Sequence, residues 1–175
     1  MIGKKIEAAF NGQINAETYS AYLYLSMSAA LEGMNLPGFA NWIRVQAQEE
    51  MVHAMKFYTH IIERNGTVTL KAIDTPPVKW KTVNSVFEDA LAHEQKVTGM
   101  INDLVDLAIK EKDHAANMFL QWFVNEQIEE EKNPSDVLKK LEFVKDRPEG
   151  LLMLDKEMAA RIFTPPAAAA DQGGA

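Results

Sequence analysis

The sequence predicts an all-α protein, a four-helix bundle with one long crossover between its second and third helices and a short fifth helix near the C-terminal end. Glycine and proline are confined to a few short stretches, and long runs of helix-forming residues lie between them. Within each run, core-type residues recur at alternating spacings of three and four, the period of one helix face. Two connections are short and one is long, which favours two hairpins joined by a crossover.

The first two predicted helices cover residues 4–32 and 37–64. Because the connection over 33–37 is short, these helices should form an antiparallel hairpin. The next segment, 65–82, contains two adjacent prolines and is long enough to cross the bundle. The third helix would therefore run parallel to the second.

The third and fourth predicted helices cover 83–110 and 113–145, and the short turn between them indicates a second hairpin. Pro134 lies inside the fourth helix. Since proline has no backbone N–H to donate, we expect a kink there, or a restart of the helix with Asn133 as its N-cap. A short fifth helix is expected over 149–162.

Length and composition limit the classes of protein to which the chain can belong. We expect one domain over residues 1–164 and a mobile tail over 165–175, because the tail has too little apolar surface to fold. The chain has no cysteine, which excludes disulfides, thiolate metal sites and cysteine nucleophiles. The 25 acidic residues outnumber the 18 basic ones, which disfavours nucleic acid and favours cations as partners. Neither a signal peptide nor a membrane span is recognisable, so we expect a cytoplasmic protein that does not enter a membrane.

Each long helix carries a carboxylate on the face that should be buried. In helix 37–64, Glu50 and His53 share a stripe with Phe39, Ile43 and Phe57. An ionised carboxylate buried alone costs several kcal/mol, and the lysines and arginines do not share these stripes. A metal ion is therefore the remaining partner. The corresponding polar residues of the other helices are Gln13, Glu17, Glu94, Gln127 and Glu130.

The heights of these residues along the bundle agree. Glu17 precedes Asn35, at the first turn, by 18 residues, and His53 follows it by 18. Glu94 and Glu130 stand at the same 18-residue separation from Lys112, at the second turn. At a rise of ~1.5 Å per residue, all four lie about 27 Å from the turn of their own hairpin.

The two hairpins also repeat one spacing. Glu50 and His53 follow Glu17 by 33 and 36 residues, and Gln127 and Glu130 follow Glu94 by the same intervals. A Glu-x-x-His pair alone is typical of a helix surface, but the repeated pattern at one height predicts a metal site. Carboxylate oxygens with a single imidazole suit iron or manganese.

Other polar residues have less specific interpretations. Tyr24 lies two turns after Glu17 on the same face, either as a core tyrosine donating to a carboxylate or in a redox role. The three remaining histidines lie off the stripes or near helix ends, and we expect them to be solvated rather than ligands: His60, His93 and His114.

The sequence resembles the non-haem ferritins of bacteria and archaea, which implies a ferritin-like fold. The resemblance covers nearly the whole chain and rests on NGQINAETYSAYLYLSMSA, NWIRVQAQEEMVHAMKFY, HEQ, FLQWFVNEQIEEE and LLMLDKE. It implies that Glu17, Glu50 and His53 bind a first iron, with Glu50 bridging to a second. The other residues that it implicates are Glu94 and Glu130 at the second iron, Gln127 beside the pair, Tyr24 near it, and Glu49, Glu126 and Glu129 at a looser third site.

The resemblance implies an iron-storage protein that oxidises Fe²⁺ with O₂ and deposits ferric mineral inside a cage of 24 subunits, with the fifth helix at the four-fold pores. Met51 matches the haem-binding methionine of bacterioferritins, but non-haem ferritins also carry a methionine there. Haem binding is therefore an open alternative that is not favoured. A rubrerythrin-like peroxidase would usually carry a cysteine-ligated module and a second Glu-x-x-His, and this chain has neither. A DNA-coating mini-ferritin would need a basic tail, and a metal-free scaffold would leave the buried acids unexplained.

Overall fold

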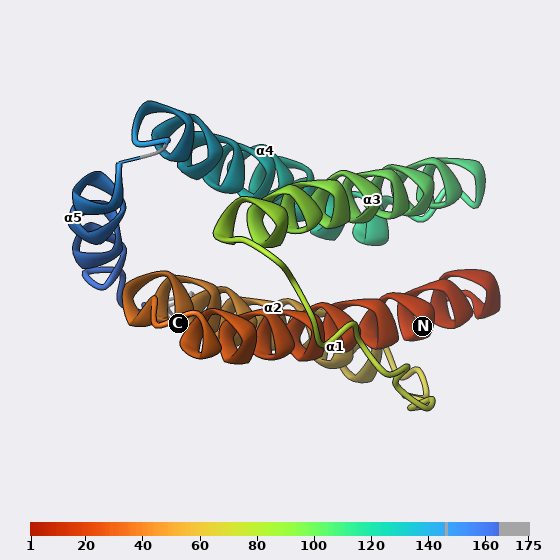
Figure 1. The fold of residues 1–175 in the computed structure, drawn as a ribbon. Coiled ribbons are helices and arrows are strands. Elements are labelled where there is room, and N and C mark those ends of the chain that lie inside the picture. The colour runs from red at the N-terminus through yellow and green to blue at the C-terminus, as the bar shows by residue number, and fades with distance from the viewer. Residues whose placement is uncertain (146, 165–175) are drawn as a thin grey trace, which may run out of the picture.

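The computed structural model describes residues 1–145 and 147–164, and within them it contains five α-helices and no β-strand (Figure 1). The predicted tail, 165–175, lies outside the described residues. The helices are α1 (Lys4–Gly33), α2 (Pro37–Glu63), α3 (Val83–Lys110), α4 (His114–Phe143) and α5 (Pro148–Met158).

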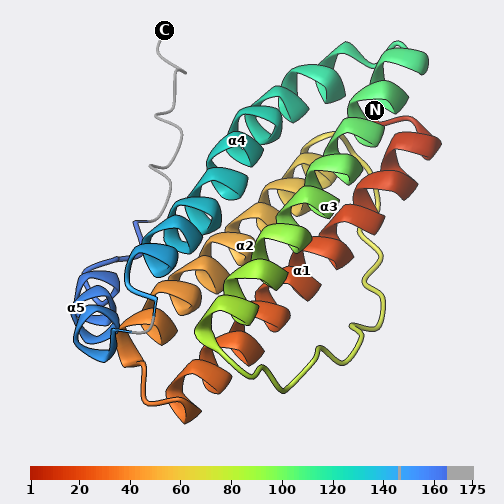
Figure 2. The same cartoon turned by 45° about the horizontal axis from the view of Figure 1, so that its top comes forward.

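Two hairpins form the bundle, one of α1 and α2 and one of α3 and α4. Between α2 and α3 the chain runs without regular structure along the outside of α1, from one end of the bundle to the other (Figure 2). As a result α2 and α3 run parallel, which confirms the predicted crossover. The α5 helix lies across the end of the bundle, beside the start of α2 and the end of α4 (Figure 1).

The helix ends have local causes. Asn35, Asn65 and Lys112 adopt positive φ angles of 60°, 54° and 55°, each just after a helix, which lets the chain reverse or leave the bundle. Thr82 begins α3 with a capping box, and the Asp113 side chain begins α4 by accepting a hydrogen bond from Ala116 N. Asn35 and Lys112 thus mark the two hairpin turns, as predicted.

Pro134 does not divide the fourth helix. The α4 helix is continuous from His114 to Phe143, so the alternative of a restart at Asn133 is wrong. Pro134 is itself buried, and Val137 and Leu141 continue the buried stripe beyond it. A proline removes only one backbone donor, and side-chain packing on both sides holds the helix together.

The fifth helix ends earlier than the predicted residue 162. It stops at Met158, and the residues that follow turn back onto α2, where Asn41 donates to the carbonyl oxygens of Ala159 and Arg161 at 3.3 and 2.9 Å. Two carbonyl oxygens of this segment therefore accept from a side chain of α2 instead of from a further turn of α5.

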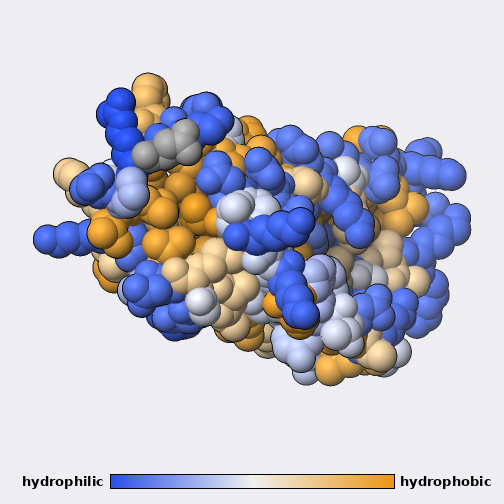
Figure 3. Space-filling view, in the orientation of Figure 1, coloured by the Kyte–Doolittle hydropathy of each residue, from blue (hydrophilic) through white to orange (hydrophobic). Residues whose placement is uncertain are grey.

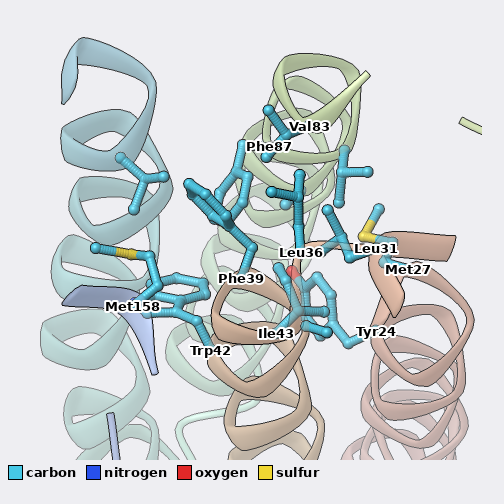
Figure 4. Close-up of a cluster of buried hydrophobic side chains, with 14 of the residues drawn as sticks. Tyr24, Met27, Leu31, Leu36, Phe39, Trp42, Ile43, Val83, Phe87 and Met158 are labelled. Atoms are coloured by element: carbon cyan, nitrogen blue, oxygen red, sulfur yellow. The ribbon is translucent and has the colours of Figure 1, made fainter. Parts of the chain in front are cut away.

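The apolar core consists of two clusters separated along the bundle. One lies toward α5 and includes Tyr24, Phe39, Trp42 and Phe87 (Figure 4). The other lies toward the chain N-terminus and includes Phe10, Phe57, Ile101, Leu120 and Phe123. In Figure 3, hydrophobic side chains also gather next to α5, where a hollow is lined by residues of α3, α4 and α5. None of the helices described is long and apolar enough to cross a membrane.

Candidate metal centre

A layer of polar side chains lies between the two apolar clusters. It takes residues from all four long helices, and each is at most 4 % exposed. These side chains are buried and converge at one level, which confirms the predicted stripes and heights. The residues of the layer are Glu17 from α1, Glu50 and His53 from α2, Glu94 from α3, and Gln127 and Glu130 from α4.

The acids and the histidine form two adjacent ligand groups. In the first, one ligand atom each from Glu17, Glu50 and His53 lie within 4.8 Å of one another. In the second, the same holds for Glu50, Glu94 and Glu130. Glu50 belongs to both groups, so its carboxylate can serve two metal ions side by side.

Amide and hydroxyl groups orient these carboxylates. Gln13 Nε2 donates to Glu17 Oε1 at 2.9 Å, and the Tyr24 hydroxyl donates to Glu94. The contact made by Tyr24 is the one expected of a core tyrosine. Among the described residues, Glu17 Oε2 is buried and has no hydrogen-bond partner, so this oxygen is free to bind a cation.

On the α3 and α4 side, Gln127 Nε2 donates to the Thr98 hydroxyl at 3.2 Å and approaches a Glu94 carboxylate oxygen at 3.4 Å. On the α2 side, Gln46 Nε2 donates to Glu50 Oε1 at 3.2 Å and also to Glu130. One amide therefore serves both Glu50 and Glu130, and a second lies beside Glu94.

Burial makes these carboxylates hard to ionise. Loss of solvent, with repulsion from Glu50 second, raises the pKa of Glu17 to about 8. Burial, followed by the charge of Glu94, raises the pKa of Glu130 to about 8 as well. The pKa values of Glu50 and Glu94 are raised well above their usual range for the same reasons. In the described residues no lysine or arginine pairs with these four acids, so a divalent cation is the partner that would stabilise their ionised forms.

The residues of the expected third site are only partly brought together. Glu126 Oε1 lies 3.9 Å from His53 Nε2, and these two residues form a further ligand group with Glu130. Glu49 instead forms an ion pair with Arg161, from the segment after α5. Glu129 is exposed and belongs to none of the three ligand groups found in the described part of the chain.

Two of the three other histidines differ from expectation. His93 is partly buried, its Nε2 lies 2.8 Å from the Ser20 hydroxyl, and burial lowers its pKa to about 4. The His60 ring stacks on Phe119, with centroids 4.1 Å apart. The prediction that both are solvated is wrong, because each fills space between packed helices, whereas His114 is exposed as expected.

The sequence pattern assigns no functional role to Gln46, Thr98 or Arg161. Thr98 follows Glu94 by four residues, so its helix position could have revealed it. Arg161 offers no such signal, since it lies 112 residues after Glu49 and outside any helix.

Comparison with known proteins decides the family. A model of the ferritin-like domain matches residues 7–144. The chain belongs to the ferritin family. It is 40 % identical to a bacterial non-heme ferritin of Bacteroides fragilis (strain 638R) over 161 residues, which are 92 % of this chain and all of that protein. A bacterial non-heme ferritin of Staphylococcus saprophyticus is 39 % identical over 163 residues, 93 % of this chain and 98 % of the relative.

Solved ferritin structures agree with the fold. The open-pore ferritin of Archaeoglobus fulgidus superimposes with a TM-score of 0.91 at 47 % identity, covering 93 % of this chain and all of that one. A closed form of the same ferritin, engineered by mutagenesis, gives a TM-score of 0.92 at 48 % identity, with 94 % and 100 % covered. The resemblance drawn from the motifs is therefore confirmed, as is the ferritin-like four-helix bundle.

Proposed function

We propose that this ferritin is an iron-storage protein that oxidises two Fe²⁺ ions with O₂ in the buried layer and stores the ferric product. One observation carries the proposal: two adjacent ligand groups share Glu50 deep inside the bundle, and no lysine or arginine of the described residues pairs with their acids. Iron is here the substrate, and oxygen ligands with one imidazole suit it.

Each residue has a role in this scheme. Glu17 and His53 hold one Fe²⁺, Glu94 and Glu130 hold the other, and Glu50 serves both. The Tyr24 hydroxyl fixes Glu94, and Gln127 lies beside the pair. The raised pKa values mean that carboxylic acids must release protons as Fe²⁺ binds.

The oxidation needs only Fe²⁺, O₂ and protons, and no additional reductant or oxidant. Each Fe²⁺ gives one electron to O₂, and with two protons the products are two Fe³⁺ and one H₂O₂. Holding both ions in adjacent groups places them close enough for one O₂ to receive both electrons. Hydrolysis of Fe³⁺ then yields mineral, which we propose is held inside a homo-oligomer of 24 subunits.

We further propose a looser auxiliary iron site beside the pair, formed by Glu49, Glu126 and Glu129. The ligand group of Glu126 with His53 and Glu130 supports it, since that group adjoins both positions of the pair.

Aerobic loading with Fe²⁺ tests the function. Rapid-mixing absorbance should show fast formation of ferric species in the parent, and electron microscopy should show mineral cores in particles whose mass, from light scattering, fits about 24 subunits. Glu17→Ala should slow the oxidation, while Glu88→Ala, which removes an exposed acid of α3, should not. Equal rates for Glu17→Ala and the parent, or a protein that stays monomeric and forms no mineral, would contradict the proposal.

A further inference from the structure

Arg161 connects the C-terminal segment to the polar layer. Its Nη1 donates to Gln46 Oε1 at 3.0 Å, and Gln46 Nε2 in turn donates to Glu50 and Glu130. Arg161 and Gln46 therefore link a segment outside the four long helices to two of the proposed iron ligands. The side chain of Gln46 is 3 % exposed, so water has little access to its amide.

The chemistry of the guanidinium fixes the direction of the amide. Arginine can only donate, so the group that faces Arg161 must be the Gln46 oxygen. The Gln46 nitrogen is then directed at the two carboxylates, where it can donate. The reverse orientation would set the amide oxygen against Glu50 and Glu130 and its N–H groups against the guanidinium. Ionised Glu50 and Glu130 favour the same orientation, because a carboxylate can only accept. A protonated carboxyl group could instead donate to the amide oxygen, so Arg161 is the contact that selects this orientation whatever the protonation state of the two acids.

Arg161 is itself held from several sides. Its Nη2 forms an ion pair with Glu49, and its guanidinium carbon lies 4.1 Å above the Trp42 ring. Its Nη1 also approaches the Trp42 carbonyl oxygen at 3.3 Å, and its own carbonyl oxygen accepts from Asn41. The side chain is only 18 % exposed. These contacts fix its rotamer, unlike that of a surface arginine with a single partner.

We propose that Arg161 is a positioning residue for the metal centre: it holds Gln46 so that the amide nitrogen faces Glu50 and Glu130. The role rests on the proposed function, because it matters for the binding of cations between these carboxylates. Residues that orient metal ligands typically change metal affinity by roughly 10–100-fold when they are replaced.

Calorimetric titration of the full-length apo-protein with Zn²⁺, a redox-inert probe, tests the role separately from oxidation. Arg161→Ala and Gln46→Ala should each weaken binding at the buried pair by roughly tenfold or more. Because both act through one amide, the double variant should bind no more weakly than Gln46→Ala alone. Lys140→Ala is the matched control: it removes the 2.5 Å ion pair between Lys140 and Glu157, which also ties α5 to a long helix but does not touch Gln46.

The Arg161→Lys variant distinguishes loss of the contact with Gln46 from loss of folding and from loss of the positive charge. Lysine keeps a positive charge beside Glu49, but it lacks the planar guanidinium that reaches Glu49 and Gln46 together. The affinity for Zn²⁺ should therefore fall as in Arg161→Ala. The melting temperature should stay closer to that of the parent. Parental affinity in Arg161→Lys would show that charge beside Glu49 is sufficient and would overturn the role assigned to Gln46.

Two further results would overturn the proposal: parental Zn²⁺ affinity in Arg161→Ala, or losses that simply add in the double variant. The proposed function fails by a different result. If the parent binds Zn²⁺ in the buried pair with the expected dependence on Arg161 but does not oxidise Fe²⁺, the positioning role stands and the ferroxidase activity does not.

Discussion

Glu50 differs from the other buried acids because its carboxylate is part of both ligand groups. We expect Glu50→Ala to slow the first oxidation of Fe²⁺ more than any other single acidic substitution, by at least tenfold on the order-of-magnitude scale of residues that orient ligands. Rapid-mixing absorbance after the first Fe²⁺ addition measures this. Glu63→Ala, an exposed acid near the end of the same helix, is the control. A Glu50→Ala variant as fast as the parent would show that this carboxylate does not bridge.

Glu49, Glu126 and Glu129 flank the pair rather than belong to it. If they form an auxiliary site, changing all three to Ala should lower the iron bound per subunit and slow the second and later Fe²⁺ additions, while the first oxidation is much less affected. Successive aerobic additions, with iron counted after each, provide the measurement. If later turnovers and bound iron match the parent, the three residues are surface charge. The exposure of Glu129 makes it the weakest of the three candidates.

Among the helices, α5 depends on a glycine at the start of α2. A Cβ added at Gly38 would lie 1.7 Å from the backbone oxygen of Asp155, so α5 would have to move. The Asp155 carboxylate also accepts a hydrogen bond from Phe39 N at 3.0 Å, which satisfies a free donor at the start of α2. The sequence contains this glycine but not the reason for it, because the reason lies 117 residues further along the chain.

We expect Gly38→Ala to lower the free energy of unfolding by about 1–3 kcal/mol, as overpacking usually does. It should also weaken Zn²⁺ binding, since Arg161 follows α5 directly. Gly99→Ala is the matched control: nothing lies within 4 Å of its added Cβ, and alanine in the exposed interior of α3 should raise stability by up to about 1 kcal/mol. Thermal melts decide, and a Gly38→Ala variant as stable as Gly99→Ala would mean that α5 is not fixed at this contact.

For the molecule as a whole, the buried acids link stability to pH. In the folded state Glu17 and Glu130 keep their protons up to a pH of about 8, because burial raises their pKa values. In the unfolded chain they lose them near the ordinary glutamate pKa of 4.5. Between these pH values the folded state binds more protons. The stability of the apo-protein should therefore fall, by several kcal/mol in all, as the pH rises from about 4.5 through 8.

Melts of metal-free protein across that range check this, and two variants separate the cause. Glu17→Gln, which resembles the protonated acid, should fall less steeply, while Glu88→Gln, at an exposed position, should follow the parent. Bound Zn²⁺ should remove the decline, because the ion stabilises the ionised carboxylates in the folded state. Apo-protein whose stability rises from about pH 5 to 8 would contradict the buried acidic layer.

Periodicity made most of the fold predictable. Helix spacing determined which side of each helix Glu17, Glu50, Glu94 and Glu130 occupy, and connection lengths determined that two hairpins and a crossover hold them at one height. Both properties are local, since the rise and period of an α-helix are the same wherever the helix lies. The convergence of the proposed ligands could therefore be calculated from residue numbers.

What the sequence by itself determined was the face and the height of each proposed ligand, and hence the carboxylate-rich layer shared by four helices. Only the tertiary structure decided that Arg161 donates to Gln46, that α4 continues through Pro134, and that the backbone of Asp155 lies against Gly38. The physical reason is that two of these features are contacts between residues more than a hundred positions apart in the sequence. The third, at Pro134, depends on how the side chains around one residue pack. Such contacts have no period along the chain, and they exist only once the helices have packed together.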